Sequence, residues 1–177
     1  MQIRTATYDD IPVLMEIFRK ARGIMRACGN LHQWNDSYPS EGTVREDIGH
    51  GHCSALCEAG KATATMAFLP GPDPTYARIY EGGWLSDGPY HVIHRIAVAE
   101  PGHNAAEALL DWGFARTQSI RIDTHEDNVI MHHVLSKYGF TRCGVILLAN
   151  GDPREAYQMN LRQPVSIQRK QSQNIDI

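Results

Sequence analysis

Histidine and cysteine are the residues of this chain that could bind a metal or, in the case of histidine, carry protons near neutral pH. The 177 residues include nine histidines, which gather toward the middle of the chain, and four cysteines. One group, His50, His52, Cys53 and Cys57, has metal-ligand side chains, but its spacing matches no recognised zinc motif. We therefore expect no metal site, and a metal-binding protein is only the third functional alternative.

Asp123 and His125 form a second pairing, which suggests proton transfer. The two residues are two positions apart in a segment whose apolar and polar residues alternate, so they share one face of a strand. A carboxylate beside a histidine can orient the imidazole while it accepts a proton. A structural ion pair of Asp123 with Arg121 or Arg95 is the alternative interpretation.

Composition excludes several other classes of protein. Lys and Arg number 17 against 20 Asp and Glu, a net charge of −3 at pH 7, so we expect neither nucleic acid nor a membrane as a partner. No apolar run reaches the roughly 20 residues that span a bilayer, and the first residues lack the apolar stretch of a signal peptide. We expect a cytoplasmic protein with reduced cysteines.

Residues 1–162 should form one domain, followed by a polar, mobile tail over 163–177.

The periodicity of the apolar residues predicts the elements that must position these side chains. Strands are expected over 3–6, 54–59, 62–69, 92–98, 119–124, 140–148 and 155–161, with a further extended segment over 77–84. Helices are expected from near residue 10 to 27, and over 43–48, 106–114 and 127–138. Thr43 and Glu46 have capping-box spacing, Asn128 should cap the last helix, and Gly139 should end it.

This order of elements predicts an α/β fold with a mixed central sheet of about seven strands and helices on both faces. The strand–helix–strand–helix portion between residues 92 and 138 requires at least one parallel pair of strands, because a helical crossover returns the chain in the same direction.

Two segments together resemble the GCN5-related N-acetyltransferase (GNAT) superfamily. Residues 94–98 read His-Arg-Ile-Ala-Val and are followed by a loop and Leu109-Leu110, and residues 123–128 read Asp-Thr-His-Glu-Asp-Asn before Lys137-x-Gly139-Phe140. The opening Ile-Arg-x-Ala-Thr also resembles the family's first strand, and the order of elements agrees over residues 3–161. Residues 93–97 and 121–125 are similar to a less-studied bacterial branch of the superfamily.

The resemblance implies that the parallel strands 92–98 and 119–125 splay apart in the middle of the sheet to admit the pantetheine arm of acetyl-CoA, the co-substrate. Backbone groups freed in this way would bind pantetheine, and one N–H would polarise the thioester carbonyl. The pyrophosphate would bind at the N-terminus of the following helix. The residues implied in cofactor binding are Ile96, Ala97, Val98, Gly102, His103, Asn104, Ala105, Ala106 and Asn128.

The pyrophosphate loop departs from the family's pattern of Gln/Arg-x-x-Gly-x-Gly/Ala. Pro101 stands where a basic or amide residue is expected and lacks an N–H, and Asn104 replaces a glycine. Ala106 fits the pattern. The loop therefore loses one or two donors, which would weaken CoA binding, although His103 could restore positive charge if it is protonated.

The catalytic residues of the family are carried over less directly. The tyrosine that protonates the leaving thiolate is replaced by Leu135, which leaves Tyr138 and one of His132 and His133, above all His133, as candidate acids. Glu81 precedes the central strand, where the superfamily often places its base, and His94 lies within that strand. A solvated carboxylate, a core histidine and a core aromatic are the structural alternatives for Glu81, His94 and Tyr138.

The side chains expected around the acceptor lie on loops and at the end of a strand. Trp34, Trp84 and Tyr90 are loop aromatics that could line a pocket or could instead cover the edge of the sheet, and His125 ends the second splayed strand.

The resemblance therefore implies an acetyl-CoA-dependent N-acetyltransferase that moves an acetyl group to an amine of a small molecule or peptide by direct attack. The alternative is a non-catalytic acyl-CoA-binding or regulatory module with the same fold, which the altered loop and Leu135 favour. The acceptor and the oligomeric state, a homodimer included, stay open.

Overall fold

The computed structural model describes residues 1–100, 102 and 104–161. Its strands are β1 (Gln2–Thr5), β2 (Cys53–Glu58), β3 (Lys61–Pro70), β4 (His91–Val98), β5 (Ser119–Thr124), β6 (Thr141–Leu147) and β7 (Pro153–Asn160). Its α-helices are α1 (Ile11–Ala27), α2 (Glu41–Gly49), α3 (Ala105–Phe114) and α4 (Val129–Tyr138), and two short 3₁₀ turns cover Tyr8–Asp10 and Pro74–Tyr76. The expected elements are confirmed in type and order, except for the extended segment over 77–84.

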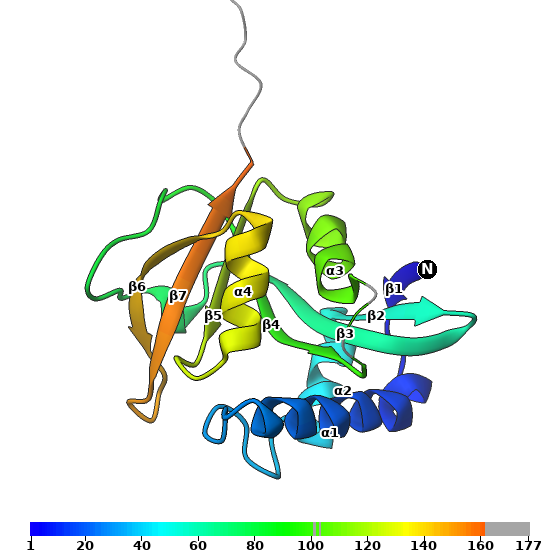
Figure 1. Ribbon diagram of the computed structural model, residues 1–177. Helices are drawn as coiled ribbons and strands as arrows, with labels where there is room; N and C mark the ends of the chain where they lie inside the picture. Colours follow the sequence, from blue (N-terminus) through cyan, green and yellow to red (C-terminus); the bar gives the residue numbers. More distant parts are fainter. Residues whose placement is uncertain (101, 103, 162–177) are drawn as a thin grey trace, which may run out of the picture.

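The seven strands form one mixed sheet in the order β1-β2-β3-β4-β5-β7-β6 (Figure 1). β1 to β4 are antiparallel neighbours in chain order, and β7 lies between β5 and β6. β4 and β5 are the parallel pair that the helical crossover requires. The predicted α/β fold with a mixed seven-stranded sheet is therefore confirmed.

Helices cover both faces of this sheet because its strands carry apolar residues on both sides. On one face, Leu14 and Phe18 of α1 pack in a core with Ala55 of β2. On the other face, Leu109 of α3 and Leu135 of α4 pack with the next set of strand residues, which includes Leu56, Ile93, Ile120 and Ile122. Figure 1 shows α1 and α2 together on one side of the sheet and α3 and α4 on the other.

The parallel pair separates after a short stretch of pairing. β4 and β5 are paired only from His91↔Ile120 to Ile93↔Ile122, although β4 continues to Val98 and β5 to Thr124. Beyond Ile93 the backbone groups of β4 that face β5 have no strand to pair with. The implied splaying of the two central strands is thus present.

A β-bulge lies at the point of separation. The β3–β4 register shifts between Thr65↔Ala97 and Ala67↔His94, and Arg95 within the bulge has a left-handed φ of 53°. A left-handed conformation is costly for a residue other than glycine, and the Arg95 guanidinium binds both carboxylate oxygens of Asp47 on α2, at 2.7 and 2.8 Å. This bidentate bond attaches the bulge to α2.

The long segment 71–90 between β3 and β4 covers the sheet beside the bulge, and it is not a strand. Tyr80 makes an isolated bridge with Val145 of β6, and the amide of Gly83 donates to the Cys143 carbonyl at 2.9 Å. Tyr76, 1% exposed, packs in a small core with Val92, Ile146 and Ala156. The segment is therefore held by its own side chains and a few backbone bonds rather than by a strand ladder.

The helix ends show one error of the sequence analysis and two confirmations. α2 begins at Glu41 and is capped by Ser40, whose hydroxyl accepts from the Thr43 amide at 3.1 Å, so the Thr43–Glu46 capping box is wrong: the helix starts two residues before Thr43. Asn128 caps α4 by accepting from the Met131 amide at 3.1 Å. Gly139, with φ 113°, ends that helix as expected.

Candidate active site

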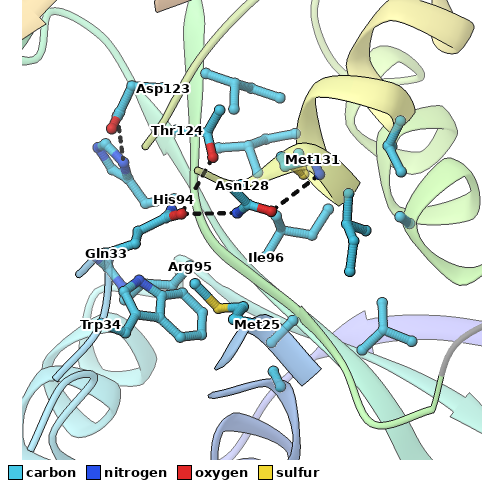
Figure 2. Close-up of a pocket in the computed structure, with 18 of the residues that line it drawn as sticks. Met25, Gln33, Trp34, His94, Arg95, Ile96, Asp123, Thr124, Asn128 and Met131 are labelled. Atoms are coloured by element: carbon cyan, nitrogen blue, oxygen red, sulfur yellow. Dashed lines mark hydrogen bonds and ion pairs between the residues drawn. The ribbon is translucent and has the colours of Figure 1, made fainter. Parts of the chain in front are cut away.

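A cavity of about 720 Å³ lies where β4 and β5 separate. Its lining comes from α1 and the loop that follows, from the segment 71–90, from β4 and the end of β5, from the N-terminal turns of α3 and α4, and from the β6–β7 turn and the start of β7. Figure 2 shows β4 running through this region near Ile96, with His94 and Asp123 to one side, Met25 on α1 and Trp34 on the loop that follows α1. The cavity is large enough for a small-molecule site.

The expected cofactor-binding residues are brought together along one wall of this cavity. Ile96, Ala97 and Val98 line it from the unpaired half of β4, and Gly102, Asn104, Ala105 and Ala106 line it at the start of α3. Asn104 is left-handed, with φ 52°, and its side chain does not cap the helix, so the described residues leave the first amides of α3 available to an anion. His103 lies outside the described residues.

Asn128 lies at the junction of β5 and α4, and it has a second partner besides the helix it caps. Its Nδ2 donates to Oε1 of Gln33 at 2.8 Å, and the same oxygen accepts from Asn30 Nδ2 at 2.9 Å and from Thr124 Oγ1 at 3.4 Å. Both Gln33 and Asn128 line the cavity (Figure 2). Gln33 thus connects the loop after α1 to the end of β5.

His94 lies between two carboxylates from different parts of the chain. Its Nε2 is 2.9 Å from Oδ2 of Asp73, in the segment 71–90, and its Nδ1 is 3.7 Å from Oδ1 of Asp123, on β5. The Tyr76 hydroxyl donates to the same Asp123 oxygen at 2.7 Å. His94 and Asp123 line the cavity, so the imidazole and one of its carboxylates face the space that a substrate would occupy.

The environment sets the charge states of two groups in this cluster. The bond from His94, together with that from the Thr75 amide, lowers the pKa of Asp73 to about 2, which keeps it ionised at neutral pH. Burial, followed by the neighbouring Asp123 charge, raises the pKa of Tyr76 well above its ordinary value. Tyr76 therefore remains a neutral hydroxyl that donates to Asp123.

Three of the four expected catalytic residues lie away from this cavity. The Glu81 carboxylate is 72% exposed and lies 3.9 Å from Arg142. His133 is exposed on α4. Tyr138 donates to Asp111 at 2.6 Å and stacks on Phe114, which makes it a contact between α3 and α4. Of the expected set, only His94 lines the cavity.

The residues expected around the acceptor are divided between two sites. Trp34 lines the main cavity and is 8% exposed. Trp84 and Tyr90 line a separate, smaller cavity of about 430 Å³, where their rings hold the Arg121 guanidinium at 4.0 and 3.8 Å from their centroids. His125 does not line the cavity, but its ring is 6.2 Å from that of His32, which does.

Sequence reasoning missed four residues of this region, which are Asp73, Tyr76, Gln33 and Arg154. Asp123 was considered, with His125 or an arginine as its partner, but its contacts are His94 and Tyr76. The loop turn at Asp73-Pro74 is visible in the sequence as a helix start with an acidic cap, and Asp73 does accept from the Thr75 amide at 2.8 Å. Nothing in the sequence indicates that the same carboxylate also reaches His94.

Among the His, Cys, Asp and Glu side chains of the described part of the chain, no group of three or more is arranged to hold a metal ion. Within residues 1–100, 102 and 104–161, no helix has the length and apolar character needed to cross a bilayer.

Comparison with known proteins agrees with the fold. No protein-family model matches the chain, and no curated protein matches it. Among solved structures, a GNAT-family acetyltransferase from Streptococcus agalactiae 2603 is 34% identical, with a TM-score of 0.82, over 92% of this chain and 96% of that one.

Two more distant structures share the fold. A GNAT-family acetyltransferase from Listeria monocytogenes 4b F2365 is 20% identical, with a TM-score of 0.66, over 90% of this chain and 94% of its own. The protein yncA from Salmonella typhimurium, solved with its cofactor acetyl-CoA, is 16% identical, with a TM-score of 0.60, over 94% and 96% of the two chains. The similarity to the streptococcal protein extends over nearly the whole of both chains, and by it this chain belongs to the GNAT family of acetyltransferases.

Proposed function

We propose that this protein is an acetyl-CoA-dependent N-acetyltransferase whose acceptor is an amine of a small molecule or peptide. The observation that carries the proposal is that one cavity, of about 720 Å³, joins the β5-facing edge of β4 and the N-terminus of α3, which the Asn104 side chain does not cap, to the His94–Asp123 pair. A cofactor with a long amide-rich arm and an anionic pyrophosphate fits the first two features, and an amine fits the third.

Acetyl-CoA would supply the acetyl group as a thioester. The chain's part is to bind the pantetheine amides with those backbone groups of Ile96, Ala97 and Val98 that face β5, because β4 pairs with β3 on its other side but has no partner on the β5 side beyond Ile93. The free amides at the start of α3, from Ala105 onward, would bind the pyrophosphate with the help of the helix dipole. An N–H of β4 would also stabilise negative charge on the carbonyl oxygen under attack.

His94 is the proposed general base. An amine is protonated at neutral pH and must lose a proton before it can attack. Asp123, which lines the cavity, would bind the ammonium group, and the His94 Nδ1, 3.7 Å from Asp123, would accept its proton. Asp73 and Tyr76 are positioning residues, because each holds one member of this pair by a hydrogen bond.

Two measurements on the purified protein test the proposal. Isothermal titration calorimetry should show binding of acetyl-CoA, and a thiol assay should show release of free CoA when a panel of amines is added. His94→Gln should bind acetyl-CoA as tightly as wild type and release CoA far more slowly. Absence of binding at millimolar acetyl-CoA would contradict the proposal.

A second candidate is a non-catalytic acyl-CoA-binding module. Two residues favour it. Leu135, which is completely buried, stands where many family members have the tyrosine that acts as general acid, and the hydroxyl of Tyr138 donates to Asp111. This function predicts acetyl-CoA binding with no release of CoA for any amine, so the same thiol assay separates the two candidates.

A further inference from the structure

We propose that the acceptor amine carries a carboxylate close to its reacting nitrogen, as a small amino acid does, and that Arg154 on β7 binds that carboxylate. The inference rests on the proposed acetyltransferase function and specifies its substrate class.

Arg154 is a buried cation on the wall of the cavity. The residue is 6% exposed and lines the same cavity as His94. The only hydrogen bond of its side chain among the described residues runs from Nη1 to the Pro153 carbonyl, at 2.8 Å. In that part of the chain, no carboxylate oxygen lies within 4.0 Å of its side-chain nitrogens. Buried arginines are normally paired with a carboxylate or another anion, and here a ligand can supply the missing partner.

The position of Arg154 relative to Asp123 suits a molecule with both charges. Asp123 pairs with Ala156 across the β5–β7 ladder, and Arg154 is two residues from Ala156. Since side chains two residues apart share a face, Asp123 and Arg154 are diagonal neighbours, roughly 7–8 Å apart at their backbones. An ammonium held by Asp123 and a carboxylate held by Arg154 must then belong to a compact molecule.

The other charged groups on this wall do not change the assignment. Arg95 also lines the cavity, but both oxygens of Asp47 already bind its guanidinium. Asp152, in the β6–β7 turn, is exposed and accepts a hydrogen bond from Asn150 Nδ2 at 2.8 Å. Arg154 is therefore the cation of this wall that has no anion of its own, within the residues that the structure describes.

The test compares matched pairs of amines in the thiol-release assay. Each pair is a small amino acid and its carboxamide, for example glycine and glycinamide or alanine and alaninamide, and agmatine serves as a cationic amine. For wild type we expect kcat/KM to be at least tenfold higher for the amino acid than for its carboxamide, because a charged pair in a desolvated site discriminates strongly. Agmatine should be a poorer acceptor than either amino acid.

Substitution of the arginine should remove this preference. Arg154→Met should raise the KM for the amino acid at least tenfold and bring it to that of the carboxamide, while the Kd for acetyl-CoA stays the same. Arg154→Lys keeps the positive charge and should retain part of the preference. Arg45→Met, at an exposed arginine of α2 that pairs with Glu41, is the matched control and should behave as wild type.

The remaining outcomes separate a failure of this inference from a failure of the proposed function. CoA release that is as fast with carboxamides or agmatine as with amino acids would overturn the inference and leave the acetyltransferase proposal intact. No release with any amine would overturn both. If thermal unfolding shows that Arg154→Met does not fold, the wild-type comparison of amine pairs and the Arg154→Lys variant decide the question.

Discussion

The Nε2 of His94 lies 2.9 Å from Oδ2 of Asp73, which joins the central strand β4 to the covering segment 71–90. The two residues are 21 positions apart in the chain. Because Tyr76 of the same segment donates to Asp123, the segment controls both members of the proposed proton-transfer pair. Substitutions in this segment should therefore change the reaction rate even where the replaced side chain does not contact a substrate.

Replacement of His94 should affect the chemical step. For His94→Gln we expect kcat to fall by roughly 10²- to 10⁴-fold, the usual contribution of a general base, with little change in the Kd for acetyl-CoA. Steady-state kinetics and calorimetry measure the two quantities. His50→Gln, at an exposed histidine after α2, is the control. An unchanged kcat in His94→Gln would remove His94 from the mechanism.

The Asp73 carboxylate should make stability depend on pH. Its pKa is lowered in the folded state from 3.8 to about 2, so its contribution is fully present above pH 4 and is lost as the pH falls through about 2. Asp73→Asn should therefore reduce the free energy of unfolding at pH 6 by on the order of 1 kcal/mol after allowance for solvent screening. Urea titrations at pH 6 and pH 2.5 measure the difference, which should shrink at the lower pH. Asp9→Asn, at an exposed carboxylate, should show no such trend.

The two bonds of Asn128 can be separated by a pair of variants. Asn128→Ala removes the cap of α4 and the bond to Gln33, and should cost about 1–2 kcal/mol of unfolding free energy. Asn128→Ser keeps a capping oxygen but cannot reach Gln33, so its cost should be smaller. Chemical denaturation of both variants tests the assignment, and equal costs would show that the cap contributes nothing.

Two adjacent glycines in the covering segment should respond very differently to a methyl group. A Cβ at Gly82 would overlap the Cys143 carbonyl, whereas a Cβ at Gly83 would meet nothing within 4 Å. Gly82→Ala should therefore lower stability by about 1–3 kcal/mol and also reduce kcat, because the segment carries Asp73 and Tyr76. Gly83→Ala is the matched control. Thermal unfolding and thiol release measure the two effects, and equal behaviour of both variants would mean that the segment does not dock as described.

Local sequence patterns predicted the elements of this protein well because local forces decide them. The strand β5 and the Asn128 cap are set within a few residues, and both are confirmed, although β5 is buried on both faces rather than on alternate residues. The contact between His94 and Asp73 could not be predicted in this way, since it depends on how the segment 71–90 folds back over the sheet.

Two candidate catalytic residues show which part of the site could not be predicted from the sequence. Glu81 precedes β4, but the backbone bonds of Tyr80 with Val145 and of Gly83 with Cys143 hold the chain there against β6, and the Glu81 carboxylate is exposed beside Arg142. Tyr138 has the residue type of an acid, but its hydroxyl is bound by Asp111, a partner on α3 that helical periodicity does not reveal. The role of a polar side chain is fixed by distant partners, and these are set by tertiary structure.

The short β4–β5 pairing also has a consequence for how the chain acquires its structure. β1 to β4 pair in chain order within residues 2–98, and β5 to β7 pair within residues 119–160, whereas three residue pairs join the two sets of strands. Contacts of low sequence separation form early, because little chain entropy is lost in closing them. During synthesis the first four strands can therefore associate before the last three leave the ribosome. The β4–β5 junction, beside which the ligand cavity lies, is then the last part of the sheet to form.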